Sequence, residues 1–194
     1  MFLYLPARRL PKIAREFLSY TRSPAAQLVI RRSGFVDQSP EEISLNFQGD
    51  RIANAVSVSG DELPLENLRT MIRKLSGMKR LTTSFRFETG STRLDAQSRS
   101  NVEQLARALE AGRYDGRSLV FIGFSDGEGA ANANLEISKR RAEVVRKAIV
   151  KAAESADFTQ LGISVDAYGE SMPMACDDTA WGRQVNRRVE VWVR

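Results

Sequence analysis

Histidine is absent from the 194-residue chain, and cysteine occurs once, at Cys176. Without histidine, Ser-His-Asp and Cys-His catalytic arrangements and histidine-based metal sites are excluded. A single cysteine excludes a disulfide within the chain. No apolar run approaches the roughly 20 residues of a membrane-spanning helix, and the apolar residues 2–5 are too few for the core of a signal peptide. We therefore expect either a cytoplasmic protein or a longer one whose true N-terminus, with its export signal, lies upstream of Met1.

Charge of one sign is not concentrated anywhere in the chain. The 29 Lys and Arg residues are mixed with 24 Asp and Glu residues, which gives a net charge of +5. This balance permits a polyanionic partner without requiring one. Because exposed aromatic residues are not interleaved with basic ones, we expect a solvated surface and no nucleic-acid partner.

The C-terminal part of the chain alternates between strand and helix patterns. Strand patterns occur at residues 82–87, 118–124, 163–167 and 189–193, and helical spacing occurs at 102–109 and 134–153. The order βαβαββ predicts an α+β fold of two layers (an α/β sandwich), with helices on one face of a mixed sheet. We place this domain at residues 80–194, with Val189, Val191 and Val193 on one face of the sheet.

The N-terminal part is less regular. Residues 2–5 predict a short strand, and two helices follow before Gly34. These elements are too small to bury a core of their own, so residues 1–36 are interpreted as the closing piece of a larger domain. Residues 37–79 are mostly polar and predict a linker that ends in one short amphipathic helix, Leu65–Leu75.

Three sequence blocks lie where these elements begin or end. They are GFSDG at 123–127, NLEISKRRA at 134–142 and GRQVNRRVEV at 182–191. In this order and spacing, over about 110 residues, they resemble the OmpA-like peptidoglycan-binding family. Phe124, Ser125 and Ile137 stand where that family usually has His or Tyr, Thr and Leu. Each replacement keeps size or chemistry, so the resemblance still implies the family's fold.

The resemblance implies a site for the diaminopimelate of the peptidoglycan stem peptide. In that family an Asp and an Arg hold this group, and here they would be Asp126 and Arg141. Diaminopimelate carries an ammonium and a carboxylate on one carbon, so its site needs an anion and a cation close together. Asn134 lies two helical turns before Arg141 on the same stripe. The candidate ligand-binding residues are Asp126, Arg141, Asn134, Ser125, Gly127, Arg187 and Arg188.

Two alternatives remain open at these positions. Asp126 and Arg141 could form a purely structural salt bridge. Of Arg187 and Arg188, one could help the ligand carboxylate while the other braces the sheet. Asp126 and Glu128 lack the other ligands of a calcium loop, so we expect no metal and no cofactor. No nucleophile–base pair is available, so we expect no catalytic residue and no enzyme.

A second resemblance concerns the N-terminus. The run REFLSYTRSPAAQ at 15–27, followed by GFV at 34–36, is similar to the C-terminal end of phosphate-type periplasmic substrate-binding proteins. The anion-binding loops of those proteins would lie upstream, so no phosphate site is assigned to this chain.

Together the two resemblances imply a periplasmic protein of a Gram-negative bacterium. It would bind peptidoglycan non-covalently and anchor an envelope protein to the cell wall, and sequence upstream of this chain could associate it with the outer membrane. The alternative function is that of the C-terminal part of a phosphate-type solute-binding or uptake protein, in which wall binding is secondary.

Overall fold

The computed structural model describes residues 9–57, 65–88 and 90–194. The chain forms two compact units, Met1–Ser39 and Pro40–Arg194. The strand predicted over residues 2–5 lies outside the described residues.

The first unit consists of two helices, α1 (Lys12–Thr21) and α2 (Pro24–Arg32). The Ser23 side chain caps α2 by accepting a hydrogen bond from the backbone N–H of Ala26. The apolar side chains of both helices remain largely exposed, including Ile13, Phe17 and Val29. The two helices therefore enclose no core of their own, as their size predicts.

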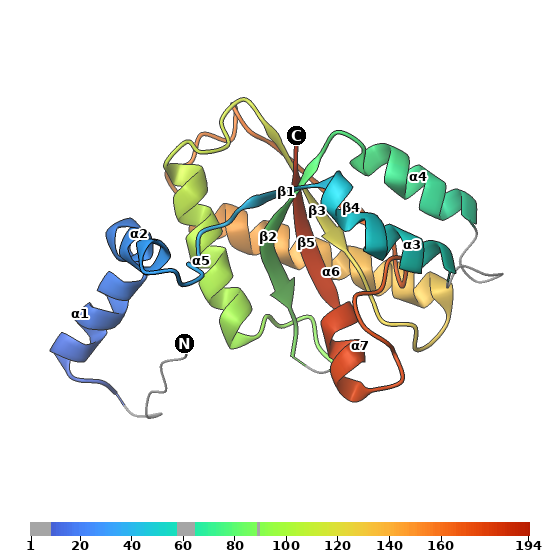
Figure 1. Cartoon of the computed structure of the whole chain (residues 1–194), viewed down its shortest axis with the longest axis horizontal. Coiled ribbons are helices and arrows are strands. Elements are labelled where there is room, and N and C mark those ends of the chain that lie inside the picture. Colours follow the sequence, from blue (N-terminus) through green and yellow to red (C-terminus); the bar gives the residue numbers. More distant parts are fainter. Residues whose placement is uncertain (1–8, 58–64, 89) are drawn as a thin grey trace. The chain divides into compact units, whose positions relative to one another are not determined.

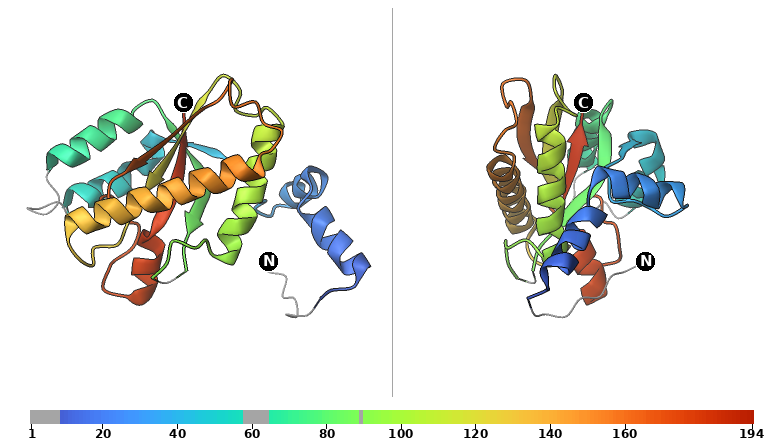
Figure 2. Two further views of the ribbon diagram at one scale, coloured as in Figure 1. Left: turned by 180° about the vertical axis from the view of Figure 1, so that it is seen from behind. Right: turned by 90° about the vertical axis from the view of Figure 1, so that its left-hand side faces the viewer.

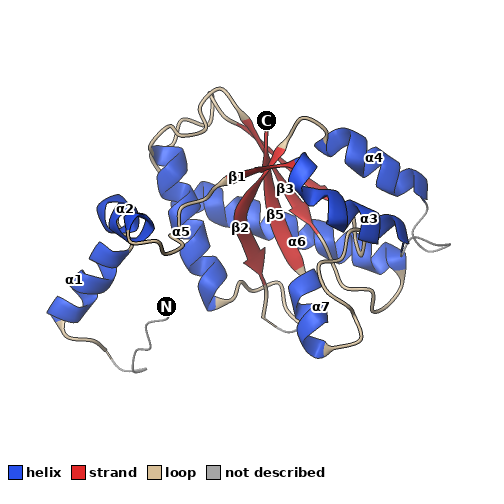
Figure 3. Ribbon diagram, in the orientation of Figure 1, coloured by secondary structure: helices blue, strands red, loops and turns tan. Residues whose placement is uncertain are grey.

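The second unit is built around one five-stranded mixed sheet (Figures 1 and 3). Its strands are β1 (Glu42–Ser44), β2 (Lys79–Arg86), β3 (Ser118–Gly123), β4 (Gly162–Ala167) and β5 (Arg188–Val193). Their order across the sheet is β1-β2-β5-β3-β4, in which β3 and β4 are parallel and the other neighbours are antiparallel. The mixed sheet predicted from the sequence is confirmed.

One face of the sheet is covered by the two long helices α5 (Ala96–Glu110) and α6 (Ala131–Ala152), as Figure 2 shows from behind. Val189, Val191 and Val193 all point into this layer, where they are fully buried with the helix residues Leu105 and Val145. The predicted orientation of the last strand and the single long helix over 134–152 are both confirmed. A short helix, α7 (Ala180–Asn186), lies between β4 and β5 and was not predicted.

The other face of the sheet is covered by residues that the sequence assigned to a linker and one short helix. A 3-10 turn, η1 (Leu45–Gln48), leads into α3 (Gly49–Ser57), and α4 (Leu65–Leu75) follows. Met71 and Leu75 of α4 pack against Ile122 and Trp192 of the sheet, and β1 pairs with β2. The helix predicted over Leu65–Leu75 is confirmed, but the rest of the region 37–79 forms β1, η1 and α3 where a linker was expected. These elements help to cover the second face of the sheet, where β3 is apolar and Trp192 of β5 is buried.

Two truncations should distinguish the first unit, which the sheet does not need for folding, from the elements that cover the second face of the sheet. We expect deletion of residues 1–39 to leave the remainder cooperatively folded. Deletion of residues 1–77 should expose Ile122 and Trp192, each worth about 1.5–3 kcal/mol of burial, and so remove a large part of a typical net stability. Thermal unfolding by circular dichroism measures both effects. An equal melting temperature for the two truncated proteins would contradict the role assigned to α3 and α4.

Candidate functional site

The candidate site begins where β3 ends against α6. A β-carbon added to Gly123 would lie only 1.9 Å from the carbonyl oxygen of Ser138, so only glycine allows the strand to approach the helix this closely. Beyond it, the backbone N–H of Ser125 donates to the carbonyl of Gly169 at 2.7 Å. The loop that carries Asp126 is therefore fixed between α6 and the segment after β4.

Asp126 forms an ion pair with Arg187, which directly follows α7. Asp126 is only 7% exposed, and the Arg187 side chain is also largely buried. The next residue, Gly127, donates its backbone N–H to the Asp177 carboxylate at 2.8 Å. The structure thus gives Asp126 a partner other than Arg141, so the simple Asp126–Arg141 salt bridge considered from the sequence is absent.

Arg141 is a buried cation without a counter-charge in direct contact. It is 2% exposed, its Nε has no hydrogen-bond partner, and its guanidinium lies 5.3 Å from the centre of the Phe87 ring. Among the described residues, none accepts a hydrogen bond or forms an ion pair with it. Burial lowers the pKa of Arg141, the charge of Arg187 lowers it further, and Asp126 opposes both. An unpaired buried charge is costly, and the ring contact offsets only a small part of that cost.

The stripe of α6 that carries Arg141 also holds the loop after β4. Asn134, Ser138 and Arg141 are all buried on this stripe. The Asn134 amide donates to the Glu170 carboxylate at 2.7 Å, and the Ser138 hydroxyl accepts a hydrogen bond from the backbone N–H of Gly169 at 3.2 Å. Asn134 therefore has a structural partner in this structure, while the buried hydroxyl of Ser125 has none among the described residues.

Arg188 lies away from this arrangement. Its guanidinium is 1% exposed, donates to Glu190 at 2.7 Å and to the Met172 carbonyl at 2.9 Å, and lies 4.3 Å from the centre of the Phe124 ring. These contacts are those of a bracing residue. Of the two arginines left open in the sequence, Arg188 is the first residue of β5 and faces away from Val189, whereas Arg187 precedes the strand and reaches Asp126.

Asn186 holds the site together, although it was not among the candidates. Its fully buried amide oxygen accepts hydrogen bonds from the backbone N–H groups of Met174 and Ala175, and its amide nitrogen donates to Ala175 and to the Asp177 carboxylate. Asp177 in turn accepts from Gly127. The only signal in the sequence was the position of Asn186 inside the block at 182–191.

A groove of about 440 Å³ adjoins the Asn134–Glu170 contact. It is lined by side chains of α4, of α6 and of the segment after β4, among them Asn67, Thr70, Asn132, Leu135, Tyr168 and Glu170. The Tyr168 hydroxyl donates to the Asp166 carboxylate at 2.7 Å. Burial raises the pKa of Tyr168, and this hydrogen bond raises it further, so the phenol stays protonated at neutral pH.

Two general features hold for the described ranges 9–57, 65–88 and 90–194. None of the helices there combines the length and the apolar character required to span a bilayer. The same ranges contain no cluster of three or more acidic, cysteine or histidine side chains that could hold a metal ion.

The chain is similar to known outer-membrane proteins over part of its length. Outer membrane porin F of Pseudomonas aeruginosa is 32% identical over 116 residues, which cover 59% of this chain and 31% of that protein. The peptidoglycan-associated lipoprotein of Pseudomonas putida is 31% identical over 114 residues, or 58% of this chain and 63% of the lipoprotein. This chain thus spans about a third of the porin and less than two thirds of the lipoprotein.

A solved structure and a family model also match this chain. The crystal structure of the peptidoglycan-associated lipoprotein from Burkholderia pseudomallei is 23% identical, with a TM-score of 0.49 over 57% of this chain and 89% of that chain. These comparisons give no support to the resemblance of residues 15–36 to phosphate-type substrate-binding proteins. The model of the OmpA family matches residues 86–187. Because this match covers more than half of the 194 residues, the chain belongs to the OmpA family.

Proposed function

We propose that the Pro40–Arg194 unit binds peptidoglycan non-covalently through the diaminopimelate of the stem peptide and anchors its protein to the cell wall. The observation that carries this proposal is the unpaired, buried guanidinium of Arg141 near the Asp126–Arg187 ion pair. The similarity to the peptidoglycan-associated lipoprotein of Pseudomonas putida supports the same function.

The chemistry of the ligand suits these groups. The carboxylate on the terminal carbon of diaminopimelate would take two parallel hydrogen bonds from Arg141, and the ammonium on the same carbon would lie against Asp126. Arg187 orients the Asp126 carboxylate through their ion pair. Binding would thus supply the anion that Arg141 lacks in the free protein.

The expected affinity is modest. Charge-assisted hydrogen bonds contribute about 1.5–3 kcal/mol each, and much of the sum is lost to the entropy cost of association. Two or three such bonds give micromolar-class binding at most. Because the wall is a polymer with many stem peptides, attachment would depend on many copies acting together.

The remaining parts of the proposal concern the whole protein. We propose a periplasmic location, association with the outer membrane through other parts of the full-length protein, and no enzymatic activity. The alternative, a solute-uptake protein in which wall binding is secondary, is not favoured, because the similarity to substrate-binding proteins at residues 15–36 has no support.

Co-sedimentation with purified cell walls tests this function. The protein should sediment with walls whose stem peptide contains diaminopimelate, and free meso-diaminopimelate should release it. Walls that contain lysine instead should fail to sediment it, because lysine lacks the carboxylate assigned to Arg141. Equal sedimentation with both kinds of wall would rule out the proposed ligand.

A further inference from the structure

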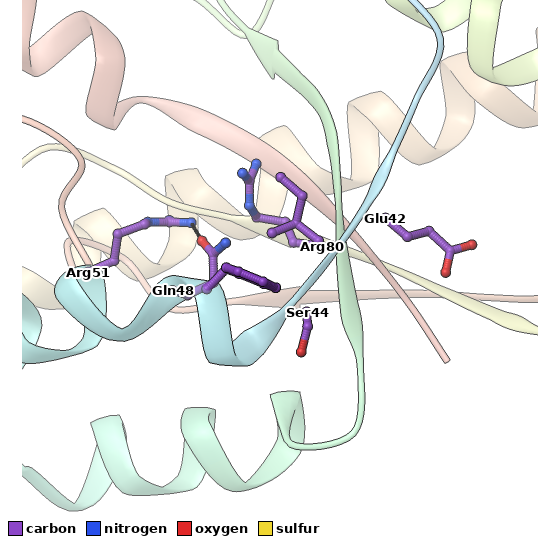
Figure 4. A pocket seen from close by; sticks show the side chains of 7 residues that line it. Glu42, Ser44, Gln48, Arg51 and Arg80 are labelled. Carbon is purple, nitrogen blue, oxygen red and sulfur yellow. Dashed lines mark hydrogen bonds between the residues drawn. The ribbon is translucent and has the colours of Figure 1, made fainter.

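A second polar pocket lies on the opposite side of the sheet from α5 and α6. It has a volume of about 560 Å³ and is formed by β1, η1, α3 and β2 (Figure 4). Its lining includes Glu42, Ser44, Phe47, Gln48, Arg51 and Arg80. The segment that supplies most of these residues precedes the part of the chain matched by the OmpA family.

Three guanidinium groups lie around a single carboxylate beside this pocket. Glu190 is 0% exposed and accepts hydrogen bonds from Arg51 at 2.6 Å and from Arg188 at 2.7 Å. Arg80 is the third cation. Burial lowers the pKa of Arg80, Glu190 raises it, and the neighbouring charge of Arg51 lowers it again. The cluster therefore holds more positive than negative charge in a largely desolvated place.

Arg80 has the fewest partners of the three. It forms no ion pair with a described residue, its Nε has no hydrogen-bond partner, and its Nη1 donates only to the Leu81 carbonyl at 3.2 Å. The carboxylate in the lining, Glu42, pairs instead with Arg117 at 2.5 Å and with Lys79 at 3.2 Å. Figure 4 shows the Glu42 side chain directed away from Arg51 and Arg80.

The other lining groups suit an anion that carries an apolar part. Gln48 is buried and accepts a hydrogen bond from Arg51 at 2.6 Å, which orients that guanidinium. Phe47 is 83% exposed although it borders the pocket, and Ile43 is a second apolar residue of the lining. Planar guanidinium groups match carboxylate and phosphate oxygens in pairs, and an exposed ring can cover an attached apolar group.

We propose that this pocket binds an oxyanion group, carboxylate or phosphate, between Arg80 and Arg51, with the apolar remainder of the ligand against Phe47. The pocket shares no residue with the Asp126–Arg141 site, so the inference does not depend on peptidoglycan binding. It also uses no residue of the segment 1–36.

Titration calorimetry with the full chain tests the site. Phenyl phosphate should bind more tightly than inorganic phosphate, and Arg80→Met should weaken phenyl phosphate binding by about tenfold or more, the loss expected for a charge-assisted contact. Arg107→Met removes the same charge from the exposed surface of α5 and should leave binding unchanged. Phe47→Ala removes an exposed ring and should not affect folding. In this variant the affinity for phenyl phosphate should fall to that for inorganic phosphate.

Sedimentation with phosphatidylglycerol vesicles distinguishes a lipid headgroup from a soluble ligand. Binding to vesicles that is lost in Arg80→Met but kept in Arg107→Met supports the site with a lipid as the source of the phosphate. Binding of phenyl phosphate without binding to the vesicles supports the site with a soluble molecule as the source of the phosphate. Absence of both interactions, or binding that Arg80→Met leaves intact, overturns the proposal.

Discussion

We expect Arg141→Ala to lose sedimentation with diaminopimelate-containing cell walls, whereas Arg140→Ala should retain it. The two residues are adjacent in α6 and carry the same charge, but Arg140 is exposed and Arg141 is buried beside the Asp126–Arg187 pair. Loss of the carboxylate contacts should weaken each site by about 1.5–3 kcal/mol, and the effect multiplies over many sites. Arg141→Lys should also bind poorly, because one ammonium cannot make two parallel hydrogen bonds.

The stability of the same variants separates a binding role from a structural one. Arg141 has no partner that its removal would leave unpaired. Arg141→Met should therefore leave the free energy of unfolding in urea unchanged or raise it, since replacing a buried charge by an apolar side chain is often neutral or stabilising. A marked loss of stability in Arg141→Met, with wall binding retained, would assign Arg141 to the framework of the domain.

The second large effect is expected at Glu190. This carboxylate is the anion of the buried cluster that contains Arg51, Arg80 and Arg188. Glu190→Gln leaves the three cations without it, and breaking a buried ion pair costs about 3–5 kcal/mol. Urea unfolding measures the change. Glu143→Gln removes a carboxylate that pairs with Arg146 at the partly exposed surface of α6, and it should cost less than about 1 kcal/mol. Similar losses in the two variants would contradict the assigned role.

Glu190 should also control the acid stability of the domain. Burial alone would raise the pKa of Glu190, but the charges of Arg188, Arg51 and Arg80 outweigh it and hold the pKa at about 2, below the ordinary value of 4.5. A carboxyl group whose pKa is lowered by folding contributes its full stabilisation above the unfolded value, and the contribution is lost as the pH falls towards the folded value. Unfolding free energies should therefore drop between about pH 4.5 and pH 2. In Glu190→Gln this drop should be smaller than in the wild type.

Local patterns in the sequence predicted the elements whose two faces differ. The alternation of Val189, Val191 and Val193 defined the last strand, and helical spacing defined α6. β1 could not be recognised in this way, because three residues, Glu42–Ser44, are too few to show a period. The face that α3 and α4 cover carries Val120, Ile122 and Trp192, and these side chains come together only in the assembled sheet.

Three charged members of the candidate site were predictable from the sequence, but their pairing was not. The three sequence blocks placed Asp126, Arg141 and Arg187 in one neighbourhood, and the structure brings them together. That Asp126 pairs with Arg187 depends on α7, a helix of seven residues that no pattern predicted. Arg187 pairs with Asp126 and Arg188 pairs with Glu190 because β5 begins between them. Strand ends are the least certain feature of a sequence-based prediction.

The position of β5 constrains the order in which this domain can fold. β5 is the last strand along the chain, yet it lies between β2 and β3, and it pairs Lys79 with Val193. β2 and β3 therefore have no common neighbour until the final strand arrives, and closing such a long loop is slow. A chain that emerges N-terminus first would stay open along the middle of this sheet until residues 188–193 are free. During that time the unpaired edges of β2 and β3 are exposed to aggregation, so a chaperone that binds extended apolar segments should delay aggregation most before β5 has emerged.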